Sequence, residues 1–202
     1  MPSDLGAAAD RISRIARNER VARHAGFWWG LAEGILFFIV PDVYITFATL
    51  YSIRAGLVAW LFSIVGSLVA VCLIYVLVTV FGSGYITFLK WIPGIGQPLL
   101  EQTAVKIAAD GLPYTPALVL GGVPLKVYAA MASTLGTSLG ALLVWTVFAR
   151  VVRIAPVFML VALMRGVARR SVDAHPAAWL GAHIVSWIAF YVFYFYQMSR
   201  LA

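Results

Sequence analysis

The stretch FFIVPDVYIT, residues 37–46, places a proline and then an aspartate in the middle of a long apolar run. Proline removes a backbone donor and clashes with the carbonyl one turn earlier, so a helix that enters this stretch should break at Pro41. The flanking pieces 27–40 and 43–53 would be about 21 Å and about 16 Å long as helices. Neither piece alone crosses a hydrocarbon core of about 30 Å. The stretch therefore predicts a re-entrant hairpin that returns to the side from which it entered.

A second stretch repeats this pattern further along the chain. IVPDVYITFA (39–48) and GVPLKVYAAMA (122–132) share Val-Pro, a charge one or two positions later, and Val-Tyr, with Lys126 in place of the acid. Two hairpins on either side of one span would face opposite leaflets, which is an inverted repeat of the kind that places transporter sites at the midplane. The predicted hairpin breaks are Pro41, Gly121, Gly122 and Pro124.

The composition is that of an integral membrane protein. Of 202 residues, 62% are hydrophobic and only 11% are charged, and the mean hydropathy is +0.92, whereas soluble chains average about 25% charged residues. The net charge of +7 suits anionic lipid headgroups. Nucleic acid is not expected as a partner, because the bases do not gather on a soluble domain. The single cysteine, Cys72, excludes an intrachain disulfide and a cysteine-based metal site.

Three stretches are long and apolar enough to span a bilayer. They are 57–81, 137–164 and 177–197. The fold class predicted is an all-α integral membrane protein with two oppositely oriented re-entrant hairpins, about three transmembrane helices and an amphipathic N-terminal helix. In chain order we expect the N-terminal helix at 1–25, a membrane domain at 26–170 (hairpin 26–53, span 57–81, loop 82–116, hairpin 112–136, span 137–164) and a final span at 177–197.

The N-terminal segment carries a basic stripe. Arg11, Arg14, Arg17, Arg20 and Arg23 recur every three residues, with Ile12, Ile15 and Val21 between them. Such a helix can lie on an anionic leaflet; alternatively, the segment is a solvated tail that only anchors the chain by its charge. The distribution of Lys and Arg predicts a cytoplasmic N-terminus, whether the broken stretches re-enter or span. The Ala- and Arg-rich composition favours a bacterial cytoplasmic membrane.

Five charged residues fall at membrane depth: Glu33, Asp42, Lys126, Arg150 and Arg153. Each costs roughly 2.5–3.5 kcal/mol at the centre of a span unless it is paired or hydrated. Arg150 and Arg153 share one helix face, and two guanidinium groups match a phosphate bidentately.

Three bases against two acids leave a positive centre that invites an anion. We therefore expect Lys126, Arg150 and Arg153 to bind the phosphate of a lipid, and Glu33 and Asp42 to gate the site or carry protons. Alternatively, the five charges form a structural network.

Other kinds of chemistry are poorly represented. His24, His175 and His183 have no metal-ligand spacing, and there is no Ser/His/Asp arrangement or phosphate-binding loop. We expect no catalytic residue, no metal and no cofactor. The small residues of GTSLG (136–140) favour close helix packing, and a homodimer through such faces is plausible.

These residues resemble the DedA family, also called the VTT or SNARE-associated membrane proteins, over roughly 27–153. The resemblance rests on Glu33 ahead of Pro41-Asp42, on Gly66 and Tyr75 in the next span, and on GGVPLKVYAAMAS (121–133) before a helix that ends at Arg150 and Arg153. The second hairpin is most similar to the branch that reads Pro-x-Lys-Val-Phe or Tyr.

The chain also departs from the more familiar branch. Gly121-Gly122 stands where that branch has an arginine, Lys126 fills its second arginine position, and Ala132-Ser133 replaces Ala-Gly.

The resemblance implies opposed re-entrant hairpins, membrane-embedded acids coupled to the proton motive force, and translocation of phospholipids or of polyprenyl phosphates such as undecaprenyl phosphate. A membrane scaffold or assembly factor is the alternative. An enzyme acting on a lipid phosphate is less favoured, because a nucleophile and a metal-ligand set are lacking.

Overall fold

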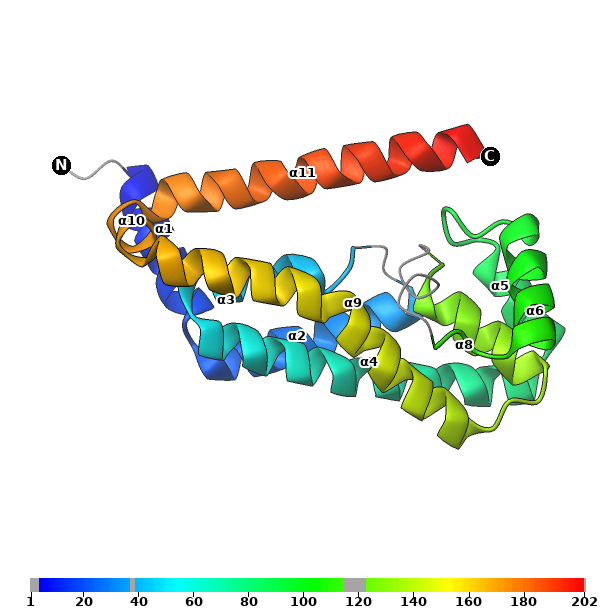
Figure 1. Cartoon of the computed structure of the whole chain (residues 1–202). Coiled ribbons are helices and arrows are strands. Elements are labelled where there is room, and N and C mark those ends of the chain that lie inside the picture. The colour runs from blue at the N-terminus through cyan, green and yellow to red at the C-terminus, as the bar shows by residue number, and fades with distance from the viewer. Residues whose placement is uncertain (1–3, 37–38, 115–122, 202) are drawn as a thin grey trace.

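The computed structural model describes residues 4–36, 39–114 and 123–201, and within these ranges the chain is helical with no strand (Figure 1). Three described helices are long and apolar enough to cross a membrane: α4 (Ile53–Phe81), α9 (Leu139–Val167) and α11 (Pro176–Leu201). The prediction of an all-α chain with about three spans is confirmed at this level.

Serine caps fix where two of the spans begin. The Ser52 hydroxyl accepts the Ala55 N–H at 3.2 Å, so α4 starts four residues before the predicted 57. The Ser138 hydroxyl accepts the Ala141 N–H at 3.3 Å at the start of α9. Such caps satisfy donors that a helix start leaves without partners. α9 runs back along α4, and the Trp60 and Phe158 rings lie 5.2 Å apart.

The first broken stretch forms two helices, α2 (Glu19–Ile35) and α3 (Asp42–Tyr51). α3 runs back toward the end of the molecule where α2 begins (Figure 1). Trp29 of α2 stacks on Tyr44 of α3 at 6.0 Å, and its indole N–H donates to the Ile39 carbonyl at 2.8 Å. The side chain thus satisfies a carbonyl that the break removes from a helix.

The limits of these arms differ from the expected 27–40 and 43–53. α2 begins at Glu19, because the Asn18 side chain accepts the Arg20 N–H at 2.9 Å. It ends at Ile35, before Pro41. A residue that precedes proline is disfavoured in a helix, and α3 begins at Asp42, directly after Pro41.

The second broken stretch ends in α8 (Leu125–Thr134), which follows Pro124 as α3 follows Pro41. Each of these helices has 10 residues, and the two run from the middle of the molecule toward opposite ends (Figure 1). α8 packs with α5 (Ser83–Leu89) and α6 (Gln97–Asp110) in one apolar cluster. The predicted breaks at Gly121 and Gly122 lie outside the described residues.

Small residues bring α2 and α4 into backbone contact. Gly26, Gly30 and Gly34 recur every four residues on α2 and face Ala59, Ser63 and Ala70 of α4. A Cβ atom at Gly30 would lie 2.2 Å from the Ser63 carbonyl oxygen. This is the small-residue packing of membrane helices. The four-residue spacing of these glycines in the sequence is sufficient to predict a closely packed helix face.

The N-terminal helix α1 (Asp4–Ala16) lies at the end where α10 (Arg169–Ala174) connects the last two spans. Ala16 is buried with Leu50, Tyr51 and Val172. The basic stripe does not form one surface, because it is divided between α1 and α2. Arg17 pairs with Asp173, whereas Arg23 lies over the Phe62 ring at 5.1 Å.

Asp173 of α10 connects the N-terminal segment with α9 at this end of the molecule. It accepts hydrogen bonds from Arg17 at 2.7 Å and from Arg165 at 3.0 Å, and these hold the pKa of Asp173 below its ordinary value. A depressed pKa contributes stability above the unfolded-state pKa of about 3.9, and this contribution is lost as the pH falls through the folded-state pKa.

We therefore expect wild type to be more stable than Asp173→Asn at pH 7 by about 1 kcal/mol, because the Asp173 side chain is 39% exposed even though that of Arg165 is only 8% exposed. The difference should begin to shrink as the pH falls below about 4 and should vanish once the pH is below the lowered pKa of Asp173. Thermal unfolding in detergent across this pH range measures it. Asp110→Asn, which removes an exposed carboxylate at the end of α6, is the control. A difference that stays unchanged from pH 7 down to about pH 2 would contradict the assignment.

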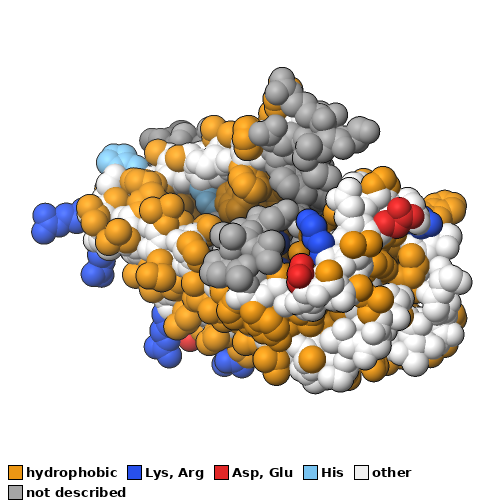
Figure 2. All heavy atoms as spheres, turned by 45° about the vertical axis from the view of Figure 1, so that its right-hand side comes forward, with side chains coloured by type: hydrophobic (Ala, Val, Ile, Leu, Met, Phe, Trp, Pro, Cys, Tyr) orange, Lys and Arg blue, Asp and Glu red, His pale blue; other side chains and the backbone are white. Residues whose placement is uncertain are grey.

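The outer surface suits a lipid environment. Figure 2 shows hydrophobic side chains over much of one face, with Lys and Arg side chains projecting at its left edge, the end where α1 and α10 lie. Exposed apolar residues continue along α4 and α9, among them Leu61, Val76, Leu160 and Leu163. A soluble protein rarely exposes apolar surface on this scale.

Candidate functional site

The five charged residues predicted at membrane depth come together in the middle of the molecule. Glu33 lies near the end of α2, Asp42 begins α3, and Lys126 lies in the first turn of α8. Arg150 and Arg153 come from α9. Four of these side chains are buried, with exposed fractions of 4% for Glu33 and Asp42, 1% for Lys126 and 2% for Arg150. Arg153 is half-buried.

Glu33 accepts hydrogen bonds from two of the three bases. Arg150 Nη2 donates to Glu33 Oε2, and Lys126 Nζ donates to the Glu33 backbone carbonyl at 2.8 Å. The second contact places a cation at the last turn of α2, where the helix dipole is negative. Removing a buried charge from water is costly unless it is paired and hydrogen-bonded. One residue of α2 therefore ties together α8 and α9.

The carboxylate of Asp42 has fewer hydrogen-bond partners among the described residues than that of Glu33. Its position at the first residue of α3 suits a carboxylate, because the helix dipole is positive there. Arg153 acts on it electrostatically more strongly than Arg150 does. Within the described residues, however, its Oδ2 atom is buried and accepts no hydrogen bond. A buried polar atom without a partner is costly, so Asp42 is the acid that can most readily change partner.

Arg153 differs from the other two bases. Among the described residues its guanidinium group forms no hydrogen bond and no ion pair, although both carboxylates act on it electrostatically. Arg150 and Arg153 lie on the same side of α9, as their spacing of three predicts. The structure thus brings together the whole predicted set, and Arg153 is the cation whose guanidinium donors no described residue uses.

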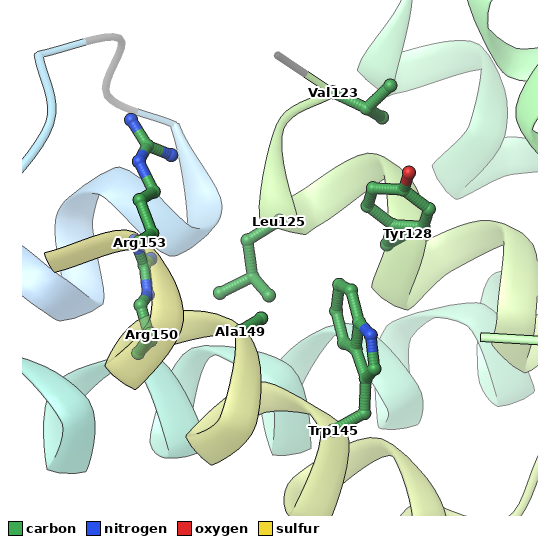
Figure 3. Close-up of a pocket in the computed structure, with 7 residues that line it drawn as sticks. All are labelled: Val123, Leu125, Tyr128, Trp145, Ala149, Arg150 and Arg153. Atoms are coloured by element: carbon green, nitrogen blue, oxygen red, sulfur yellow. The ribbon is translucent and has the colours of Figure 1, made fainter. Parts of the chain in front are cut away.

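A small pocket adjoins the two arginines. Figure 3 shows Arg150 and Arg153 on one side, the aromatic residues Tyr128 and Trp145 on the other, and Leu125 between them. Its free volume is about 20 Å³, which is of the order of one water molecule. A phosphate group does not fit this arrangement, so binding one requires the surrounding helices to move apart. The pocket is lined by Val123, Leu125, Tyr128, Trp145, Ala149, Arg150 and Arg153.

The aromatic side of this pocket, formed by Tyr128 and Trp145, was not predicted from the sequence. The rings of Tyr128 and Trp145 lie 4.9 Å apart, and the Trp145 indole N–H donates to the Pro113 carbonyl at 2.8 Å. Both residues occur in apolar runs whose members look alike in sequence. Trp145, however, precedes Arg150 and Arg153 on α9, and this placement was the available signal.

The arrangement can hold an oxyanion once it opens, because three bases and two acids leave one positive charge in excess. Comparison of the chain with family models, with curated proteins and with solved structures found no match, so a function must be argued from this buried charge cluster.

Proposed function

We propose that this protein is a DedA-like transporter that moves a phosphate-bearing lipid, such as undecaprenyl phosphate or a phospholipid, across the membrane. The observation that carries the proposal is the buried cluster of Glu33, Asp42, Lys126, Arg150 and Arg153 inside an otherwise apolar bundle. Intramembrane charges of this kind mark substrate or ion pathways in membrane proteins. The membrane is a bacterial cytoplasmic membrane, and the N-terminus is cytoplasmic.

The proposal includes two opposed re-entrant hairpins related as an inverted repeat. It is supported by α3 and α8, which each follow a proline and run in opposite directions from the cluster. A helix of 10 residues reaches about 15 Å, half of the hydrocarbon core. The second hairpin is proposed for 112–136, and its first arm lies largely outside the described residues.

In this mechanism the structure is the closed, substrate-free state. Opening of the pocket lets a phosphate reach Arg153, whose donors are unused, and then Arg150. The phosphate takes the place of Glu33 on Arg150. The displaced Glu33, or Asp42, binds a proton, which restores the charge balance. Release of the lipid on the other side returns Arg150 to Glu33 and releases the proton, so that lipid and proton movements are coupled. No covalent bond forms or breaks, and the protein is not an enzyme in this proposal.

One observation favours a second function, that of a membrane scaffold or assembly factor. Arg150 and Lys126 already bind Glu33, so most of the cluster satisfies itself without a ligand. In that case the charges would only fix how α2, α8 and α9 pack.

The test is uptake of lipid monophosphates by proteoliposomes that contain the purified protein, with and without a proton gradient. We expect Arg153→Gln to lower transport at least tenfold while the melting temperature stays near that of wild type, because Arg153 is half-buried and forms no hydrogen bond to a described residue. The control is Lys106→Gln, which removes an exposed base on α6. Equal transport by wild type and Arg153→Gln, or none by well-folded wild type across several lipid phosphates, would favour the scaffold.

A further inference from the structure

One face of α11 carries three polar aromatic side chains, one per turn. His183, Trp187 and Tyr191 are spaced four residues apart, and residues at this spacing share a helix face. All three contact the first broken stretch. The Tyr191 hydroxyl accepts the Val40 N–H at 2.9 Å.

The other two residues of this stripe contact α3. The Trp187 indole N–H donates to the Thr46 hydroxyl at 3.1 Å, and the His183 ring lies 6.0 Å from the Phe47 ring.

Beyond its first turns, which pack Trp179 against the cluster of Ala16 and Val172, α11 is weakly attached. Ile184, Val185 and Ile188 are 49%, 65% and 58% exposed, and no residue in the described apolar part of this helix is fully buried. At its start the Tyr51 hydroxyl donates to the Pro176 carbonyl at 3.0 Å. Further along, within the described residues up to Phe193, the polar stripe supplies hydrogen bonds between α11 and the bundle.

Tyr191 makes its contact two residues before Asp42, one of the acids of the charge cluster. Val40 immediately precedes Pro41 and Asp42, outside both α2 and α3, so its N–H has no helical partner. Because Val40 lies two residues before Asp42, this hydrogen bond places the Tyr191 hydroxyl beside the site. A buried backbone donor needs a partner, and here a side chain from the last helix supplies it.

We propose that Tyr191 is a positioning residue of the transport site and that α11 is its movable cover. The Tyr191–Val40 hydrogen bond holds Val40 in place two residues before Asp42. When α11 moves away from α3, Val40 is released and Asp42 becomes accessible from the side that α11 covered. The effect on transport depends on the proposed function, whereas the effect on the accessibility of position 40 does not.

The first experiment measures how accessible position 40 is to a water-soluble reagent, and it does not depend on transport. Val40→Cys is introduced after Cys72→Ala, and its reaction with a water-soluble maleimide is followed in vesicles. Tyr191→Phe removes only the hydroxyl, and we expect the labelling rate to rise about two- to tenfold, the range that a net hydrogen-bond contribution predicts. Ser186→Ala on the same helix is the control, because the Ser186 hydroxyl bonds only the Ala182 carbonyl of its own helix among the described residues.

Trp187→Phe provides a second route, because it removes the donor to Thr46. It should raise labelling in the same way, even if Tyr191→Phe folds poorly. Labelling that stays at the wild-type rate in both variants would overturn the proposal.

The second experiment measures transport kinetics. If the covered state limits binding, then Tyr191→Phe lowers the apparent KM for a lipid monophosphate by the factor by which labelling rises, because the binding-competent fraction grows. A purely structural loss would reduce the maximal rate and leave KM unchanged, which would overturn the positioning role. Faster labelling of the Tyr191→Phe variant, together with no transport by wild type, would support α11 as a movable cover and reject the proposed transport function.

Discussion

The Arg150→Gln variant is expected to lose about 3–5 kcal/mol of stability, because it leaves the buried carboxylate of Glu33 without its ion-pair partner. Glu33 and Arg150 have side chains that are only 5% and 3% exposed. Water therefore cannot replace the missing guanidinium group. Reversible unfolding in mixed detergent micelles, followed by tryptophan fluorescence, measures the loss.

Two further variants separate the cost of an unpaired charge from the loss of a contact. The double variant Glu33→Gln/Arg150→Gln should recover most of the stability, since neutral partners replace the buried pair. Arg54→Gln removes the surface pair with Glu19, whose atoms lie 2.9 Å apart and whose Arg54 side chain is 81% exposed. It should cost less than about 1 kcal/mol. If Arg150→Gln cost no more than Arg54→Gln, the buried pair would not be formed in the membrane.

Gly30→Ala is expected to have the second large effect, again on stability. The added Cβ atom would lie 2.2 Å from the Ser63 carbonyl oxygen and 2.9 Å from the Ser63 Cα atom. Both are backbone atoms, so α2 and α4 must move apart along their shared face. Overpacking of this kind costs typically 1–3 kcal/mol and occasionally more. We expect the upper part of that range.

The matched control is Gly181→Ala, which makes the same substitution inside α11. A Cβ atom at Gly181 has no heavy atom within 4 Å among the described residues. Alanine is the better helix former by about 1 kcal/mol, so this variant should be neutral or slightly more stable. The same measurement applies to both variants, and opposite signs are the expected result. Equal small effects would mean that α2 and α4 are not in backbone contact.

Much of the helix pattern could be predicted from the sequence, because it follows from local rules. Apolar length predicts the three spans, and the prolines at 41 and 124 predict where two short helices begin. The convergence of the five charges could be predicted for an energetic reason: isolated charges in hydrocarbon are too costly to scatter.

The partners within the cluster could not be predicted in this way. That Glu33 binds Arg150 and also accepts from Lys126 depends on how α2, α8 and α9 pack, and sequence spacing carries no information on such distant contacts. The end of α2 at Ile35 and the role of Tyr191 have the same origin, since each depends on a partner far along the chain. The close packing of α2 against α4, by contrast, is predictable from the sequence, because Gly26, Gly30 and Gly34 recur every four residues.

The two interactions of Glu33 affect how well the membrane holds its ion gradients. Arg150 pairs with the Glu33 carboxylate, and Lys126 donates to the Glu33 backbone carbonyl. Both the side chain and the carbonyl of Glu33 therefore already have partners, one from α9 and one from α8. The pocket beside Arg150 leaves only about 20 Å³ free, so within the described residues this part of the cluster has room for about one water molecule and not for a file of water. A membrane that contains the closed protein should therefore remain electrically tight and hold its ion gradients, so that the cell could keep many copies in place without draining them.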